Sequence, residues 1–178
     1  MLSSPGPRAD AARGATARAA FRYARRVQFA ETDLAGMVHF ANFFRYMEEA
    51  EHALWRAAGL SIDGRAPAVA PGGRFGEASP KLAREPEASR GAYKWPRVSA
   101  AFDFKRPLRF EDEFEVHVGI ATVTTRSIHY NHTVMRGDLT VGVGTVTTAC
   151  VQLGADHTLK AVEIPAEILD RLRAVIGT

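Results

Sequence analysis

The residue in this sequence best placed to do chemistry is Asp33, which lies in a short loop between a strand-like and a helix-like segment. Gly36 follows three positions later, and a long apolar segment begins just beyond it. This spacing places a carboxylate near the positive end of a helix, where backbone N–H groups have no intrahelical acceptor. Those N–H groups would polarise a carbonyl oxygen while the carboxylate attacked the carbonyl carbon or activated water. The alternative is that Asp33 only caps a turn.

Hydrophobic periodicity predicts the elements that position this loop. The segment 41–59 has the spacing of one long apolar helix, closed by Gly59 as a C-cap. Alternating apolar residues predict strands at 21–29, 98–104, 114–120, 128–134 and 139–153, and Pro165 begins a short terminal helix. Short connections between the later strands require antiparallel neighbours, and Gly142 and Gly144 suggest a bulge or bend in the last one. We therefore predict an α+β domain in which a curved antiparallel sheet of about five strands wraps around one long helix.

Charge and composition limit the function classes. The net charge of +3 arises from the leading segment, because six arginines and one acid fall within residues 1–26. The rest of the chain is slightly acidic, which argues against a nucleic-acid-binding face. No apolar run has the length of a membrane span, so no membrane partner is expected. The single Cys150 is expected to be a buried thiol of a cytoplasmic protein.

Two segments are expected to lie outside the regular structure. Residues 1–20 form a basic leader without an apolar h-region, and it is either disordered or a segment resembling an organelle transit peptide. The domain itself is expected at 21–178. Within it, 61–93 is rich in proline and glycine and is predicted to be a long loop insertion or a lid.

The loop and the start of the helix carry a recognisable pattern. Asp33 is followed by Gly36-Met37-Val38, then by His39-Phe40 and Asn42-Phe43. This pattern resembles the signature of the 4-hydroxybenzoyl-CoA thioesterase family of hot-dog proteins, and residues 97–112 resemble the central strand and turn of that family. The resemblance implies a hot-dog fold, hydrolysis of an aliphatic or aromatic acyl-CoA thioester, and no cofactor.

The resemblance also assigns roles to residues. Asp33 would be the nucleophile or general base, and the backbone N–H of Phe40 would bind the thioester oxygen. His39 could hydrogen-bond to Asp33 or be structural, and Glu48 could support the site or lie at a surface or interface. The residues expected to contact substrate are Phe29, Gly36, Phe43, Lys94, Trp95 and Arg126. Arg126 matches a basic position that contacts CoA phosphates across a subunit boundary, although Lys105, Arg106 and Arg109 could serve equally well.

The sequence departs from the family pattern at three positions. Phe29 and Phe40 replace a tyrosine and a histidine found in some members, which leaves only a mechanism that uses the aspartate and the backbone. Glu51 occupies a position where many members have arginine, and the sequence offers no physical reason. We expect Glu49 and Glu51 to be solvated or paired with Arg45 and Arg56 along the helix.

Two other functions remain open from sequence. A hot-dog hydratase or dehydratase would need a histidine in proton-shuttle geometry with an acid, but His39 is one residue too far from Asp33 for the D-x-x-x-x-H pattern. A non-catalytic acyl-CoA-binding sensor would use the same pocket without cleavage. The histidines lack metal-ligand spacing, so no metal site is expected. The family resemblance and the exposed sheet edges both imply a homodimer or a dimer of dimers.

Overall fold

The computed structural model describes residues 20–62, 93–154 and 157–177. The leader predicted at 1–20 and the loop or lid predicted at 61–93 therefore fall almost entirely outside the described residues.

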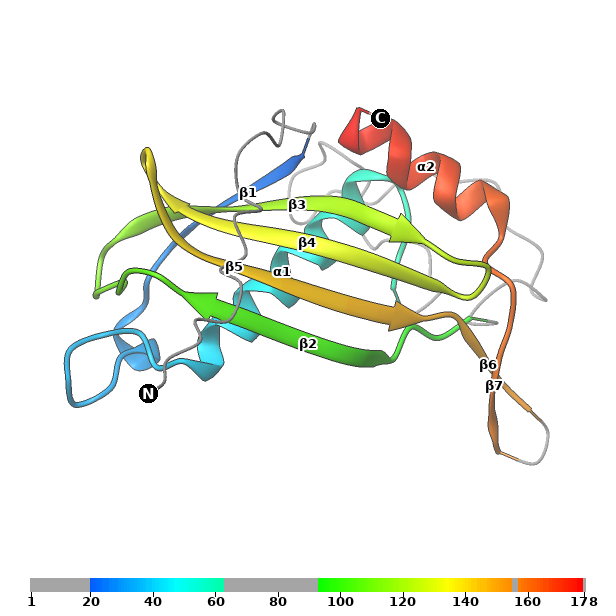
Figure 1. Cartoon of the computed structure of the whole chain (residues 1–178), viewed down its shortest axis with the longest axis horizontal. Helices are drawn as coiled ribbons and strands as arrows, with labels where there is room; N and C mark the ends of the chain where they lie inside the picture. The colour runs from blue at the N-terminus through cyan, green and yellow to red at the C-terminus, as the bar shows by residue number, and fades with distance from the viewer. Residues whose placement is uncertain (1–19, 63–92, 155–156, 178) are drawn as a thin grey trace, which may run out of the picture.

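Five antiparallel strands form one sheet in the order β1-β3-β4-β5-β2, and helix α1 crosses one face of it (Figure 1). The strands are β1 (Phe21–Arg26), β2 (Arg97–Phe104), β3 (Glu113–Val123), β4 (Ser127–Arg136) and β5 (Leu139–Ala149). The helices are α1 (Ala41–Ala57) and α2 (Ala166–Ile176), and a 3-10 turn, η1, spans Phe29–Glu31. A sheet wrapped around one long helix is the predicted α+β, hot-dog arrangement.

Helix α1 lies against the sheet because its apolar residues recur at helical spacing. Phe43, Met47, Ala50 and Leu54 are all buried, and together they form the stripe that faces the strands. The helix ends at Ala57, two residues before the predicted end. Gly59 follows in the left-handed region with φ of 70°, a conformation that glycine adopts without steric cost.

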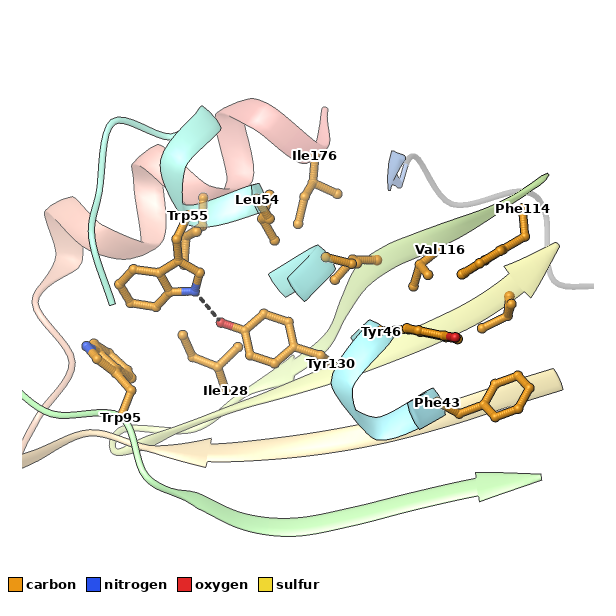
Figure 2. Close-up of a cluster of buried hydrophobic side chains, with 14 of the residues drawn as sticks. Phe43, Tyr46, Leu54, Trp55, Trp95, Phe114, Val116, Ile128, Tyr130 and Ile176 are labelled. Carbon is orange, nitrogen blue, oxygen red and sulfur yellow. Dashed lines mark hydrogen bonds between the residues drawn. The ribbon is translucent and has the colours of Figure 1, made fainter. Parts of the chain in front are cut away.

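Aromatic side chains fill the space between α1 and the inner face of the sheet (Figure 2). Trp55 donates a hydrogen bond from Nε1 to the hydroxyl of Tyr130, at 3.2 Å, so both polar atoms are satisfied inside the core. The ring of Trp55 also packs edge-on against Trp95, at 4.9 Å between centroids. Helix α2 covers the C-terminal end of α1 and adds Leu172 and Ile176 to the same core.

The two glycines of β5 have a packing role as well as the predicted bulge. The register between β4 and β5 shifts beside Gly142, where Val141 is skipped. A Cβ atom at Gly142 would collide with the ring of Phe102, and one at Gly144 would collide with Met47 and with the same ring. The missing side chains therefore let β2 and α1 pack closely against β5.

Two predicted strand boundaries were wrong. The first strand ends at Arg26 rather than near Phe29, because the chain turns into η1, where the Glu31 carboxylate accepts a hydrogen bond from the Gln28 N–H. The last strand does not run on to Leu153. It breaks at Cys150, and β6 (Val151–Leu153) pairs instead with β7 (Leu159–Ala161), a hairpin the periodicity did not reveal.

The described part of the chain contains no helix long and apolar enough to cross a membrane.

Candidate active site

A short hairpin-like loop carries Asp33 to the start of α1. An isolated bridge pairs Thr32 with Val38, and the Asp33 N–H donates to the Met37 carbonyl at 2.8 Å. Gly36 has a positive φ of 70° and donates its N–H to the Asp33 carbonyl at 2.9 Å. These contacts close a tight turn at residues 33–37, here called the Asp33 turn.

Only one oxygen of the Asp33 carboxylate accepts a hydrogen bond from the Asp33 turn. Oδ1 accepts a hydrogen bond from the Ala35 N–H at 2.8 Å, which is the capping role anticipated as the alternative to catalysis. Oδ2 accepts no hydrogen bond within the described residues, and the side chain is exposed. Capping and reaction are therefore compatible, because they use different oxygens.

The backbone N–H of Phe40 is the one open donor among the amides at 40–43. Ala41 donates to Nδ1 of His39 at 3.3 Å, Asn42 donates to the His39 carbonyl at 2.9 Å, and Phe43 donates to the Phe40 carbonyl at 3.2 Å. No acceptor in the described residues takes the N–H of Phe40, which is the N-cap of α1. An electron-rich oxygen placed there would also meet the positive end of the helix dipole.

His39 caps the helix instead of contacting Asp33. Its Nδ1 accepts from the Ala41 N–H, and its ring stacks on Phe40 with 4.4 Å between centroids. The ring is thus turned toward its own backbone, which does not favour the proton shuttle that a hydratase needs.

Exposed apolar side chains surround the Asp33 turn. Val38 donates its N–H to the Leu108 carbonyl at 2.8 Å, and this bond joins the loop to the segment 104–110. Phe29 and Phe110 pack edge to face across this junction, at 5.7 Å between centroids. The exposed large apolar residues of the two segments are Phe29, Leu34, Phe40, Phe104 and Phe110, and we call them the apolar rim. A gathering of this kind marks a binding surface.

Phe43, also predicted to contact substrate, lies in the core instead of the apolar rim. It is 3% exposed, and its ring packs against Phe102 at 4.9 Å and against Phe104 at 5.3 Å between centroids. Because its ring contacts Phe104, Phe43 packs against the buried side of the apolar rim.

Glu48, predicted as a supporting acid, is held by strand β2. Its Oε1 lies 3.0 Å from Nη1 of Arg97, and Nη2 of the same guanidinium lies 3.5 Å from Oε1 of Glu51. Glu48 is half-buried on the face of α1 that meets the edge strand, and no hydrogen bond joins it to Asp33 within the described residues.

The expectation that Glu49 and Glu51 are solvated or pair with Arg45 and Arg56 was wrong in the partners of both acids and in the solvation of Glu51. Glu51 is fully buried, because it lies four residues after Met47 and three before Leu54 and therefore shares their face of α1. Burial raises the pKa of Glu51 to about 7, with Arg97 opposing and Glu48 adding to the shift. Glu49 pairs with Arg25 of β1, whose Nε lies 2.7 Å from Oε2.

Three predicted substrate contacts lie away from the Asp33 turn within one chain. Lys94 pairs its backbone with Val151, and Trp95 is buried against Trp55 in the core. Arg126 lies in the β3–β4 turn, at the end of the sheet opposite to the start of α1 (Figure 1). The chain does not bring these residues to Asp33, so a role at the same site requires a second copy.

The basic residues of the segment 105–109 are distinguished by their partners. Arg106 donates from Nη1 to the Thr140 carbonyl at 2.7 Å, so its guanidinium is engaged in holding β5. The Arg109 guanidinium lies beside Gly36 of the Asp33 turn, is exposed, and pairs with no acid among the described residues. Of the two arginines, Arg109 is therefore the one that this segment offers to the site, and the exposed Lys105 stays an alternative. Within the described residues, no group of three metal-binding side chains comes together.

A family model decides the classification. The model of the thioesterase-like superfamily matches residues 27–172, which include the Asp33 turn, both helices except the end of α2, and every strand of the five-stranded sheet except β1. The chain belongs to the thioesterase-like superfamily. The predicted family, fold and enzyme class are thereby confirmed, and the protein is a thioesterase of the hot-dog fold.

Individual relatives agree with this classification. A protein of Aquifex aeolicus (strain VF5), described provisionally as an esterase, is 29% identical over 153 residues, covering 86% of this chain and 98% of the relative. A 1,4-dihydroxy-2-naphthoyl-CoA thioesterase from Synechocystis superposes with a TM-score of 0.66 at 20% identity, covering 86% of this chain and 95% of that one. A mutant of 4-hydroxybenzoyl-CoA thioesterase in complex with 4-hydroxybenzoyl-CoA also gives 0.66, at 18% identity, covering 86% and 99%. At these identities the two structures show a shared fold.

One residue of the site region that the sequence did not single out is Glu31, two positions before Asp33. Its carboxylate and carbonyl make most of the contacts that attach the loop to the rest of the fold. The signal in the sequence was weak: an acid three residues after Gln28, at the position of a capping box.

Proposed function

We propose that this thioesterase hydrolyses acyl-CoA esters with Asp33 as nucleophile or general base and the Phe40 N–H as oxyanion donor. The observation that carries the proposal is the pairing of an open carboxylate oxygen with an open helix-start N–H at the two ends of one closed loop. A thioester carbonyl needs both groups at once, because negative charge develops on its oxygen as its carbon is attacked.

Two routes use this arrangement. In the first, an Asp33 oxygen bonds to the acyl carbon, the C–S bond breaks, and the CoA thiolate leaves and takes a proton from water. A second water then hydrolyses the mixed anhydride and restores the carboxylate. In the second route, Asp33 takes a proton from a water molecule that attacks the acyl carbon directly. The adduct then expels the CoA thiolate by breaking the C–S bond, and the thiolate takes the proton back from Asp33. In both, the Phe40 N–H stabilises the oxyanion.

The surroundings of the site support a CoA ester as substrate. The apolar rim suits an acyl group. The guanidinium of Arg109 beside Gly36, which pairs with no acid in the part of the chain that the structure describes, suits the phosphates of the carrier. Two structures that share the fold are named for aromatic acyl-CoA substrates, so aromatic esters are the first class to test. An acyl carrier protein would present a phosphate as well, and the test below separates the two carriers.

The deciding experiment measures CoA release with a thiol reagent for the wild type and Asp33→Asn, over aromatic and aliphatic acyl-CoAs. Asparagine keeps an acceptor for the Ala35 N–H, so the turn is preserved while the reactive carboxylate is lost. We expect kcat to fall about a hundredfold or more. Cys150 adds little background, because burial raises the pKa of its thiol to about 11.

Controls separate the parts of the proposal. Asp170→Asn changes an exposed aspartate on α2 and should leave kcat unchanged. Unaltered turnover in Asp33→Asn would remove Asp33 from the mechanism and point to another acid. Wild-type activity on acyl-pantetheine equal to that on acyl-CoA would show that the nucleotide phosphates are not recognised. Activity found only on acyl-acyl carrier protein would show that the carrier is this protein and not CoA.

We also propose that the protein is a homodimer paired along β2. This strand lies at an edge of the sheet and is eight residues long. It exposes the apolar side chains of Val98 and Phe104. Long apolar edges of this kind invite pairing with another strand. Light scattering should give twice the chain mass of 19.4 kDa, and a monomer at micromolar concentration would contradict the proposal.

A further inference from the structure

The Glu31 carboxylate joins three parts of the molecule immediately before the Asp33 turn. It accepts hydrogen bonds from the Gln28 N–H at 2.8 Å and from the Tyr46 hydroxyl of α1 at 2.9 Å. It also forms an ion pair with Arg25 of β1, whose Nη1 lies 2.6 Å from Oε1. The first strand, the loop and the helix are therefore tied together through one side chain.

The backbone carbonyl of Glu31 fixes the far end of the same loop. It accepts from the His39 N–H at 2.9 Å and from Nδ2 of Asn42 at 2.8 Å. His39 immediately precedes Phe40, and Asn42 lies in the first turn of α1. One residue thus holds both the segment that leads into Asp33 and the segment that presents the Phe40 N–H.

The electrostatic surroundings keep this contact set formed. Burial by itself would raise the pKa of Glu31, but the Gln28 N–H, Arg25 and Tyr46 outweigh it and hold the pKa below its usual value. The guanidinium of Arg25 lies over the Tyr46 ring, 4.5 Å from its centroid, and its other end is held by Glu49. The side chains of Glu31 and Arg25 are only 11% and 18% exposed, so solvent screens the pair weakly.

We propose that Glu31 is the positioning residue that sets the separation between the Asp33 carboxylate and the Phe40 N–H. This inference rests on the function proposed above, since it concerns the distance between the two groups named there. The Asp33 turn itself is exposed, and among the described residues it is closed only by its own short hydrogen bonds. Reaction requires the attacking oxygen to reach the carbonyl carbon while the oxyanion donor hydrogen-bonds to the oxygen of the same carbonyl group. Small displacements of either group lower the rate steeply.

The test compares Glu31→Gln with Glu49→Gln, and the chain supplies this matched pair because both acids contact Arg25. Only Glu31 contacts the loop. We expect Glu31→Gln to lower kcat about tenfold or more with KM changed less than about threefold, and Glu49→Gln to leave both within about twofold. Tyr46→Phe removes a single hydroxyl from the Glu31 contacts and should lower kcat in the same direction by a smaller factor.

A double variant distinguishes positioning from general weakening of the fold. If Glu31 acts through Asp33, then Glu31→Gln should lower the residual rate of Asp33→Asn much less than it lowers the rate of the wild type. Equal factors in both backgrounds, or equal losses of kcat in Glu31→Gln and Glu49→Gln, would overturn the positioning role. If Asp33→Asn itself retains full activity, the proposed function fails instead, and the two failures are thereby told apart. Melting curves of every variant identify any loss of rate that comes from unfolding.

Discussion

Glu31 contacts helix α1 and Glu51 lies within it, and the surroundings of the two carboxylates shift their pKa values in opposite directions. Glu31, near the start of the helix, has a guanidinium, a hydroxyl and a backbone N–H directed at it, and its pKa is lowered. Glu51, in the middle of the helix, is fully buried with neither oxygen accepting a hydrogen bond in the described part of the structure, and its pKa is raised to about 7.

The difference shows that enough hydrogen-bond partners can outweigh desolvation and keep a carboxylate charged. Desolvation is the largest single influence on both acids and favours the neutral form of each. Only Glu31 has enough donors to reverse it. Oε1 of Glu51 lies 3.5 Å from Nη2 of Arg97, but the same guanidinium is closer to Glu48, with 3.0 Å between Nη1 and Oε1. The satisfied acid lies beside the Asp33 turn, where fixed geometry has a chemical use.

The largest effect on stability is expected from Glu31→Gln. Removing one charge leaves Arg25 with Glu49 alone and weakens the contacts to Tyr46 and Gln28, so the free energy of unfolding at pH 7 should fall by about 2 kcal/mol. Because the folded pKa of Glu31 is lowered, its contribution is present above the ordinary value of 4.5 and is lost as pH falls through the folded pKa. Urea unfolding should therefore show the wild type and the variant converging as the pH falls below 4.5.

A loss that persists unchanged in acid would show that Glu31 contributes through its shape and not through its charge. That outcome would remove one half of the comparison between the two acids.

A smaller effect of opposite sign is expected from Glu51→Gln. A folded pKa raised from 4.5 to about 7 means that the stabilising contribution is full below pH 4.5 and is lost as pH rises to about 7. At pH 8 the variant should be more stable than the wild type by on the order of 1–2 kcal/mol, less than the full shift implies because the amide is also buried. At pH 4.5 this advantage should disappear.

His132 provides an internal check on this prediction. Burial lowers its pKa to about 4, so its contribution is present above 6.5 and is lost as pH falls through about 4, opposite in sign to that of Glu51. In the wild type, the contributions of Glu51 and His132 to the pH dependence of the free energy of unfolding offset each other. Unfolding of Glu51→Gln measured at pH 8, 6 and 4.5 should therefore show a steeper decline toward acid than the wild type does. Parallel curves would mean that Glu51 does not titrate in this range.

The sequence predicted the elements well where one period dominated. The apolar spacing in α1 and the alternation in β2, β3 and β4 placed each of these within a few residues. Prediction failed where local hydrogen bonds ended an element, as at Phe29, where η1 begins, and at Cys150, where β5 gives way to β6. A turn that depends on one side-chain contact leaves no periodic signal.

For the site, the sequence by itself determined which residues carry reactive groups and, through the spacing of Asp33, Gly36 and Phe40, that a carboxylate would lie near a helix start. Spacing along one loop is local, so it can be read without knowing the fold. The tertiary structure alone decided that Glu51 is buried, that Arg109 lies beside the turn while Arg106 is bound to Thr140, and that Glu31 holds both ends of the loop. These outcomes depend on contacts between β1, α1, β2 and β5, which are distant in sequence and are brought together only by packing of the sheet around the helix.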